Sequence, residues 1–271
     1  GGRSSAVMGD GVLRSNSRED LARWLVVAFS NTGKEAAETL AFVDELDRRW
    51  FRPARVPVTW LEYRAGPAFA VVSFDTASRN GEPFDAVIRH RGHILPNVRS
   101  PYCSSELKTR TQHRYARSLG WTEWDTLVGI RADEPVRVAK FRANPSPEVA
   151  CEEIRMPLAE AGVTKWIVRN FWAAQEFDLG LPNINGETPH GNCDLCYKKK
   201  AQRVMSLIRE RPERAVWWAQ HEREAEKHAT GDGARFRNDR ASYAQMMNFA
   251  VGHHEMRFDA DEPDMTCLCG D

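Results

Sequence analysis

The 271 residues are enough for one large α/β domain or for a core domain with a smaller appendage. Lysine plus arginine and aspartate plus glutamate both number 38, so no overall charge draws the chain to nucleic acid or to a membrane. No apolar run approaches the roughly 20 residues of a spanning helix and no signal peptide is present, so we expect a cytoplasmic protein without a membrane partner.

Short apolar runs alternate with helical patterns, which is typical of βαβ units and a mostly parallel sheet. We expect strands near residues 25–29, 56–61, 69–74 and 126–130, and helices over 35–49, 103–119, 164–174 and much of 197–250. The fold class predicted is α/β, an open, mostly parallel sheet flanked by helices, with a C-terminal helical extension. The α/β domain takes residues 1–200, and residues 201–271 form the extension and a cysteine-containing tail.

The sequence begins in a glycine turn ahead of a predicted helix. Glycines at a strand-to-helix turn let the backbone approach an anion, which the first helical amides then hold. Serine hydroxyls and an arginine add donors. Because such a turn follows a strand, we expect a first strand ahead of it; a linker or tag remnant is the alternative. The candidate anion-binding residues are Gly1, Gly2, Arg3, Ser4 and Ser5.

A second turn follows the apolar run at residues 25–29. Asn31, Thr32 and Gly33 can cap the next helix and permit the turn. The carboxyl end of a central strand in an open α/β sheet is also where such folds bind ligands. Both interpretations can hold together.

The six cysteines are too few for a secreted disulfide scaffold. Cys193 and Cys196 have the two-residue spacing that lets two thiolates meet one metal, and the spacing fits redox thiols, zinc or iron–sulfur equally. Cys151 is expected to be a small buried hydrophobe. The candidate metal ligands are Cys103, Cys193, Cys196, Cys267 and Cys269, and the first three are also the candidate catalytic residues.

Five segments, taken in order, resemble the PP-loop superfamily and its phosphoadenosine phosphosulfate (PAPS) reductase-like family. Residues 1–5 resemble the end of the Ser-Gly-Gly-x-x-Ser loop, and residues 31–33 with Glu38-Thr39 resemble the family's "TG…ET" element. The others are 103–108 (Cys…Leu-Lys), 129–134 (Gly-Ile-Arg-x-x-Glu) and 156–158 (Met-Pro-Leu). The chain is most similar to members encoded by phages and prophages, whose fold is adenine nucleotide alpha hydrolase-like.

The resemblance implies that Gly2, Arg3, Ser4 and Ser5 contact phosphate or sulfate. It places Asn31, Thr32 and Gly33 beside adenosine, with charge from Lys108 and Arg131. The nucleotide would be ATP, PAPS or adenosine phosphosulfate (APS). A [4Fe–4S] cluster bound by cysteines, as in related enzymes, is the expected cofactor, with zinc as the alternative. The implied activity is reduction of an adenylated sulfate with a thiol electron donor, or ATP-dependent sulfur transfer from a sulfur donor.

The sequence also departs from the family pattern. Cys103 is followed by Ser104 rather than by a second cysteine, and Cys269 precedes Gly270 without the glutamate of the assimilatory reductases. The alternative function is a catalytically inactive, zinc-stabilised nucleotide-binding or interaction module. A basic segment at residues 203–214 fits a solvated helix face, or a grip on an RNA or DNA acceptor. The sequence predicts no oligomeric state.

Overall fold

The computed structural model describes residues 2–66, 68–145, 150–184, 188–191 and 193–252. Strands β1 (Val27–Asn31) and β2 (Val58–Tyr63) pair in parallel, and β3 (Phe69–Val72) adds to β2 in the antiparallel sense. A separate parallel pair joins β4 (Trp124–Leu127) to β5 (Glu152–Arg155). The expectation of a mixed α/β fold with a mostly parallel sheet is confirmed, and two short sheets take the place of one.

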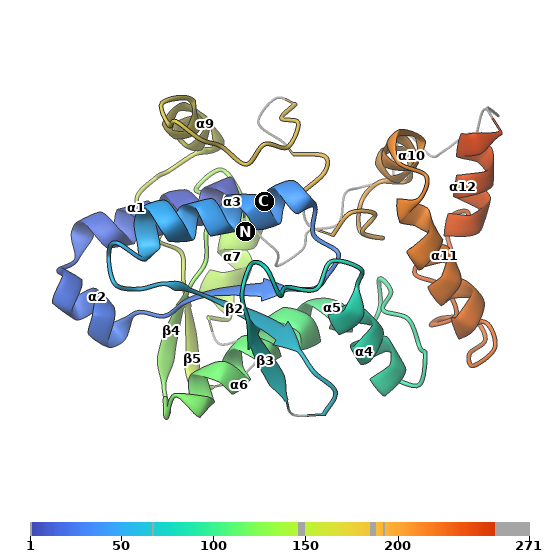
Figure 1. Cartoon of the computed structure of the whole chain (residues 1–271), viewed down its shortest axis with the longest axis horizontal. Coiled ribbons are helices and arrows are strands. Elements are labelled where there is room, and N and C mark those ends of the chain that lie inside the picture. Colours follow the sequence, from blue (N-terminus) through green and yellow to red (C-terminus); the bar gives the residue numbers. More distant parts are fainter. Residues whose placement is uncertain (1, 67, 146–149, 185–187, 192, 253–271) are drawn as a thin grey trace.

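Helices cover both faces of the three-stranded sheet (Figure 1). Helices α1 (Arg3–Ser15) and α3 (Ala37–Leu46) lie on one face, and α6 (Arg110–Ser118) packs against the other. The core between α3 and the sheet centres on Phe29 and Trp60, whose rings meet edge to face at 4.8 Å between centroids. Covered on both sides, β1 and β2 bury apolar residues on both faces, and the buried Asn31 and Glu62 lie near their carboxyl ends.

The connecting helices follow the chain between these strands. Two wide, π-type turns lengthen neighbouring helices: η1 (Asp47–Phe51) continues α3, and η2 (Ser105–Thr109) joins α5 to α6. The remaining helices of this part are α2 (Arg18–Trp24), α4 (Glu82–His90), α5 (Tyr102–Ser104), α7 (Pro135–Ala143), α8 (Pro157–Glu160) and α9 (Lys165–Ala173).

Three helices form the C-terminal part at one end of the molecule (Figure 1): α10 (Ala201–Glu210), α11 (Arg214–Ala225) and α12 (Tyr243–Val251). Their core is aromatic, with the Trp218 and Tyr243 rings stacked at 5.2 Å. The same core cluster includes Phe84 of α4 and Leu107 of η2. One hydrophobic core therefore contains residues from both sides of the predicted domain boundary at residue 200. Within the described residues, no helix is long and apolar enough to span a membrane.

Candidate functional site

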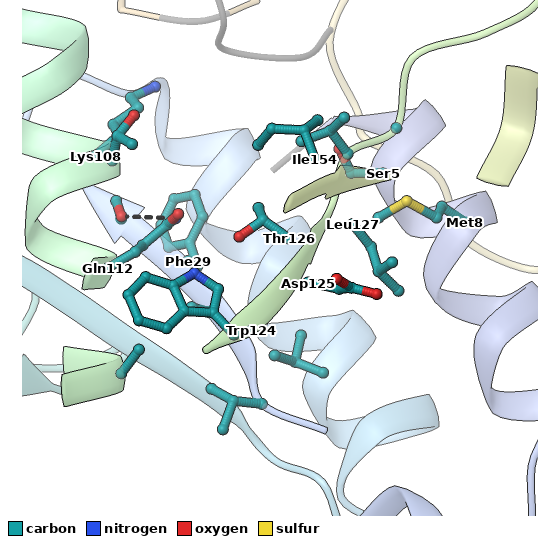
Figure 2. A pocket seen from close by; sticks show the side chains of 18 of the residues that line it. Ser5, Met8, Phe29, Lys108, Gln112, Trp124, Asp125, Thr126, Leu127 and Ile154 are labelled. Atoms are coloured by element: carbon teal, nitrogen blue, oxygen red, sulfur yellow. Dashed lines mark hydrogen bonds between the residues drawn. The ribbon is translucent and has the colours of Figure 1, made fainter. Parts of the chain in front are cut away.

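A cavity of about 860 Å³ separates the two sheets. β1 contributes residues 27–30 to its wall and β4 contributes residues 124–127. β1 pairs with β2 alone and β4 with β5 alone among the described strands, so each presents its second edge toward this space. Phe29 of β1 and Thr126 of β4 lie around the same opening in Figure 2.

The start of α1 meets the carboxyl end of β4 at the mouth of this cavity. Gly2 and Ser5 line the cavity together with Lys108 and Gly129. Gly2 is the N-cap of α1, and no side chain caps that helix end. The first amides of α1 therefore have no acceptor within the helix, which is the arrangement that binds anions. Of the predicted phosphate ligands, Gly2, Ser5 and Lys108 line this cavity, with Ser5 and Lys108 on opposite sides of it in Figure 2.

Gly129 is required at this junction by close packing. A Cβ atom built on it would lie 2.7 Å from the backbone nitrogen of Ser5 and 2.8 Å from its Cα. A backbone contact of this kind cannot be relieved by rotating a side chain. The glycine of the Gly-Ile-Arg segment thus lets β4 and α1 touch.

The two predicted phosphate-binding arginines are held by carboxylates. Arg3 binds Asp178 through two hydrogen bonds of 2.6 and 2.7 Å. Arg131 donates to Asp133 at 3.0 Å and to the hydroxyl of Ser4 at 3.1 Å. Neither arginine lines the cavity. Their interactions brace the first turn of α1 against the segments after β4 and α9.

The Asn31–Gly33 turn is built by its own side chains. The Asn31 amide donates to Glu62 at 2.7 Å, and its carbonyl oxygen accepts from the Gly33 amide at 3.1 Å. The Thr32 hydroxyl donates to Glu35 at 2.8 Å. Gly33 has φ +75°, a conformation that favours glycine. The turn-forming interpretation is confirmed; residues 31–33 do not line the cavity, whereas Ser30 and Glu35 do.

The cysteine turn packs directly on the Asn31–Gly33 turn. Cys193 forms an antiparallel backbone bridge with Glu35, and its sulfur lies 3.6 Å from the Thr32 hydroxyl. Beside it, the buried Lys34 ammonium pairs with Asp194 at 3.1 Å. Segments some 160 positions apart in sequence are therefore joined at the carboxyl end of β1.

Cys103 approaches the same turn from α5. Its sulfur lies 3.5 Å from the hydroxyl of Tyr197, the residue directly after Cys196. The buried ammonium of Lys199 donates to the carbonyl of Cys193 at 2.9 Å. Burial lowers the pKa of Lys199, and the nearby Cys196 and Cys193 thiolates act in the opposite direction. Cys103 thus contacts the turn that carries Cys193 and Cys196, and the Lys199 ammonium lies against the same turn.

The remaining cysteines divide into two groups. Cys151 lies beside the amino end of β4, where its carbonyl accepts from the Trp124 amide at 3.0 Å. It is half-buried rather than fully buried. Cys267 and Cys269 lie outside the described residues, as does Gly1.

A single ion needs its ligand atoms close together, because zinc holds sulfur at about 2.3 Å. Within the described part of the chain, Cys103, Cys193 and Cys196 do not form a group whose ligand atoms all lie within 4.8 Å of one another. A multi-iron cluster, which binds each thiolate through a different iron, tolerates wider spacing.

Sequence reasoning missed several residues of the cavity. Gln112 donates to the Ser30 hydroxyl at 3.1 Å, the dashed contact in Figure 2. Met8 and Trp124 also line the cavity. Their neighbours in sequence carry no motif, so only the packing of α1 and α6 against the strands could have identified them.

Comparison with protein-family profiles, curated proteins and solved structures found no match to this chain.

Proposed function

We propose that this chain is a PAPS reductase-like, adenine nucleotide alpha hydrolase-like enzyme. It binds an adenine nucleotide at the mouth of the cavity and carries out sulfur chemistry with the adjacent cysteines. One observation carries the proposal: Gly2, Ser5 and Lys108 line the same cavity, next to a turn on which Cys193 packs. The first residues of α1 line the cavity, and Cys193 packs on the turn that follows β1, at the strand end where open α/β folds bind ligands.

The shape and chemistry of the cavity support a nucleotide ligand. About 860 Å³ lies within the ordinary range of ligand pockets. The amides at the start of α1 and the Lys108 ammonium favour phosphate, and the apolar wall that includes Phe29 and Leu127 suits a base. Lys108 lies on the π-type turn η2, a local widening that often occurs at functional sites.

The cysteines supply the sulfur chemistry in this proposal. Two thiols of a Cys-x-x-Cys turn can deliver two electrons by closing to a disulfide, as reduction of an adenylated sulfate requires. A [4Fe–4S] cluster on Cys103, Cys193 and Cys196 would supply electron transfer or an iron that holds sulfide. The Lys199 ammonium, which donates to the Cys193 and Asp194 carbonyls, places a positive charge beside this turn.

Nucleotide binding is tested by calorimetric titration of the chain with ATP, APS and PAPS. We expect one of them to bind, and Lys108→Ala to weaken that binding by tenfold or more, about 1.4 kcal/mol. Lys140→Ala, which removes a lysine of α7 outside the cavity lining, is the matched control. Failure of all three nucleotides to bind, or equal losses in the two variants, would refute the site.

The cofactor and the reaction are tested on an anaerobic preparation. We expect iron and labile sulfide, a brown colour absorbing near ~400 nm, and release of AMP with ATP or of sulfite with APS or PAPS. Cys196→Ser should remove both colour and turnover, while Cys151→Ser, at the other end of β4, should keep both. A colourless zinc protein without turnover would instead identify the inactive module.

A further inference from the structure

Two histidines and a glutamate meet where the loop after α4 reaches the carboxyl end of α11. Glu224 belongs to α11, His228 follows one turn later, and His93 comes from the loop. Each offers one ligand atom, and the three atoms lie within 4.8 Å of one another. None of the three residues lines the cavity or belongs to the cysteine turn.

The contacts within this cluster leave one carboxylate oxygen directed to the histidines. His228 Nε2 lies 3.1 Å from Glu224 Oε1, and the His93 and His228 rings stack at 4.7 Å. Lys227 donates to the other oxygen, Oε2, at 2.6 Å. Glu224 and His228 are four residues apart and therefore share a helix face, a spacing that can direct two ligands to one ion.

His93 is held in this position by an unfavourable backbone. Its φ is +64°, in the left-handed region that few residues other than glycine adopt. Its Nδ1 is buried and, among the described residues, has no hydrogen-bond partner. Strained backbone and an unsatisfied ring nitrogen together indicate a contact that hydrogen bonds within the chain do not supply.

We propose that His93, Glu224 and His228 bind a divalent cation of the zinc class, with water completing the coordination. Two imidazoles and a carboxylate are a donor set of zinc, whereas magnesium and calcium prefer oxygen alone. The zinc ligands differ in type and location from those of the cysteine turn.

The ion would link the loop after α4 to the carboxyl end of α11. Beside the cluster, the Leu95 amide donates to the Gly233 carbonyl at 2.8 Å. A Cβ on Gly233 would lie 2.8 Å from a methyl carbon of Ile94, so the two loops are already in close contact. Coordination would fix the loop after α4 to the end of α11.

The test uses the full chain with Cys193→Ser and Cys196→Ser, stripped with chelator and titrated with Zn²⁺ and Co²⁺. We expect one ion per chain, a rise in unfolding temperature, and a cobalt spectrum without thiolate charge-transfer bands. His93→Asn keeps a residue that tolerates positive φ, so together with His228→Asn it removes ligands without adding backbone strain. Each should weaken zinc binding roughly tenfold or more, while His90→Asn, exposed at the end of α4, should not.

Unchanged zinc affinity in both ligand variants, or absence of cobalt binding, would overturn the proposal. If the serine variants fail to fold, the histidine variants are compared in the unsubstituted chain, where one bound ion per chain should be lost and any ion at the cysteine turn retained. Loss of the same ion in His90→Asn would also overturn it.

Discussion

Two regions of this molecule are packed differently: the cavity side, which holds β1, β4 and α1, and the helical side, which holds α10, α11 and α12. On the helical side, Trp218, Phe236 and Tyr243 fill one continuous core that also takes in α4 and η2. On the cavity side, β1 and β4 face each other across a space instead of pairing.

The two regions therefore have different roles. The helical side stabilises the fold, and the cavity side offers a surface to a ligand. The aromatic core anchors the cysteine turn, since Trp218 donates its indole N–H to Asp194 at 2.9 Å. The cavity leaves strand edges and the first turn of α1 accessible. Stability should therefore depend mainly on the helical side, and binding on the cavity side.

The largest loss should follow Trp218→Ala. The indole is fully buried, so its removal leaves a void and takes one hydrogen bond from Asp194, and we expect a loss of about 3–5 kcal/mol in the free energy of unfolding. Val216→Ala, at a position 40% exposed on the same helix, should cost far less. Denaturant unfolding measures both, and similar losses would contradict the assignment of stability to this core.

Glu222 should give the helical side a pH dependence. Burial raises its pKa to about 7, even though its carboxylate accepts from the Tyr243 amide. Between about pH 4.5 and 7 the unfolded chain loses this proton and the folded chain keeps it, so stability should fall as pH rises, by up to roughly 3 kcal/mol. Glu222→Gln should flatten that slope, while the exposed Glu213→Gln should leave it. Unfolding curves of both variants between about pH 4.5 and 7 measure the two slopes.

A methyl group at Gly129 should affect the cavity side. Gly129→Ala forces apart the backbone of Ser5 and the end of β4, for which we expect roughly 1–3 kcal/mol of destabilisation and weaker nucleotide binding. Gly11→Ala, within α1 and with nothing within 4 Å of the added carbon, should instead stabilise the helix slightly. Thermal unfolding measures the change in stability, and nucleotide titration measures the change in binding. A tolerated Gly129→Ala would mean that the junction is loose.

The sequence predicted the elements that carry strong local signals. The Asn31–Gly33 turn after β1 lies where its glycine predicted it, but Asn31 and Thr32 do not cap α3, whose N-cap is Ala36 without a side-chain hydrogen bond. Strand β3 is the antiparallel member of the mostly parallel sheet. Gly66, with φ +81°, lies in a tight connection in which the Arg64 amide bonds the Ala68 carbonyl, so the chain reverses directly.

Other features depend on packing that no local pattern carries. The predicted strand at residues 126–130 ends at Leu127, because the chain turns at Gly129 to meet α1. Helix α7 has a mixed sequence in which only Val138 and Phe141 are buried, so its apolar face is defined by its partners. His93 and Glu224 are far apart in the chain, so their meeting follows from how the loop after α4 packs on α11.

The backbone bridge between Glu35 and Cys193 joins the Asn31–Gly33 turn to the cysteine turn. With the Lys34–Asp194 ion pair beside it, neither turn can shift without displacing the other. A ligand in the cavity, which Glu35 lines, should therefore affect the surroundings of the Cys193 sulfur through this backbone bridge. Reactivity at that thiol should report whether the pocket is filled.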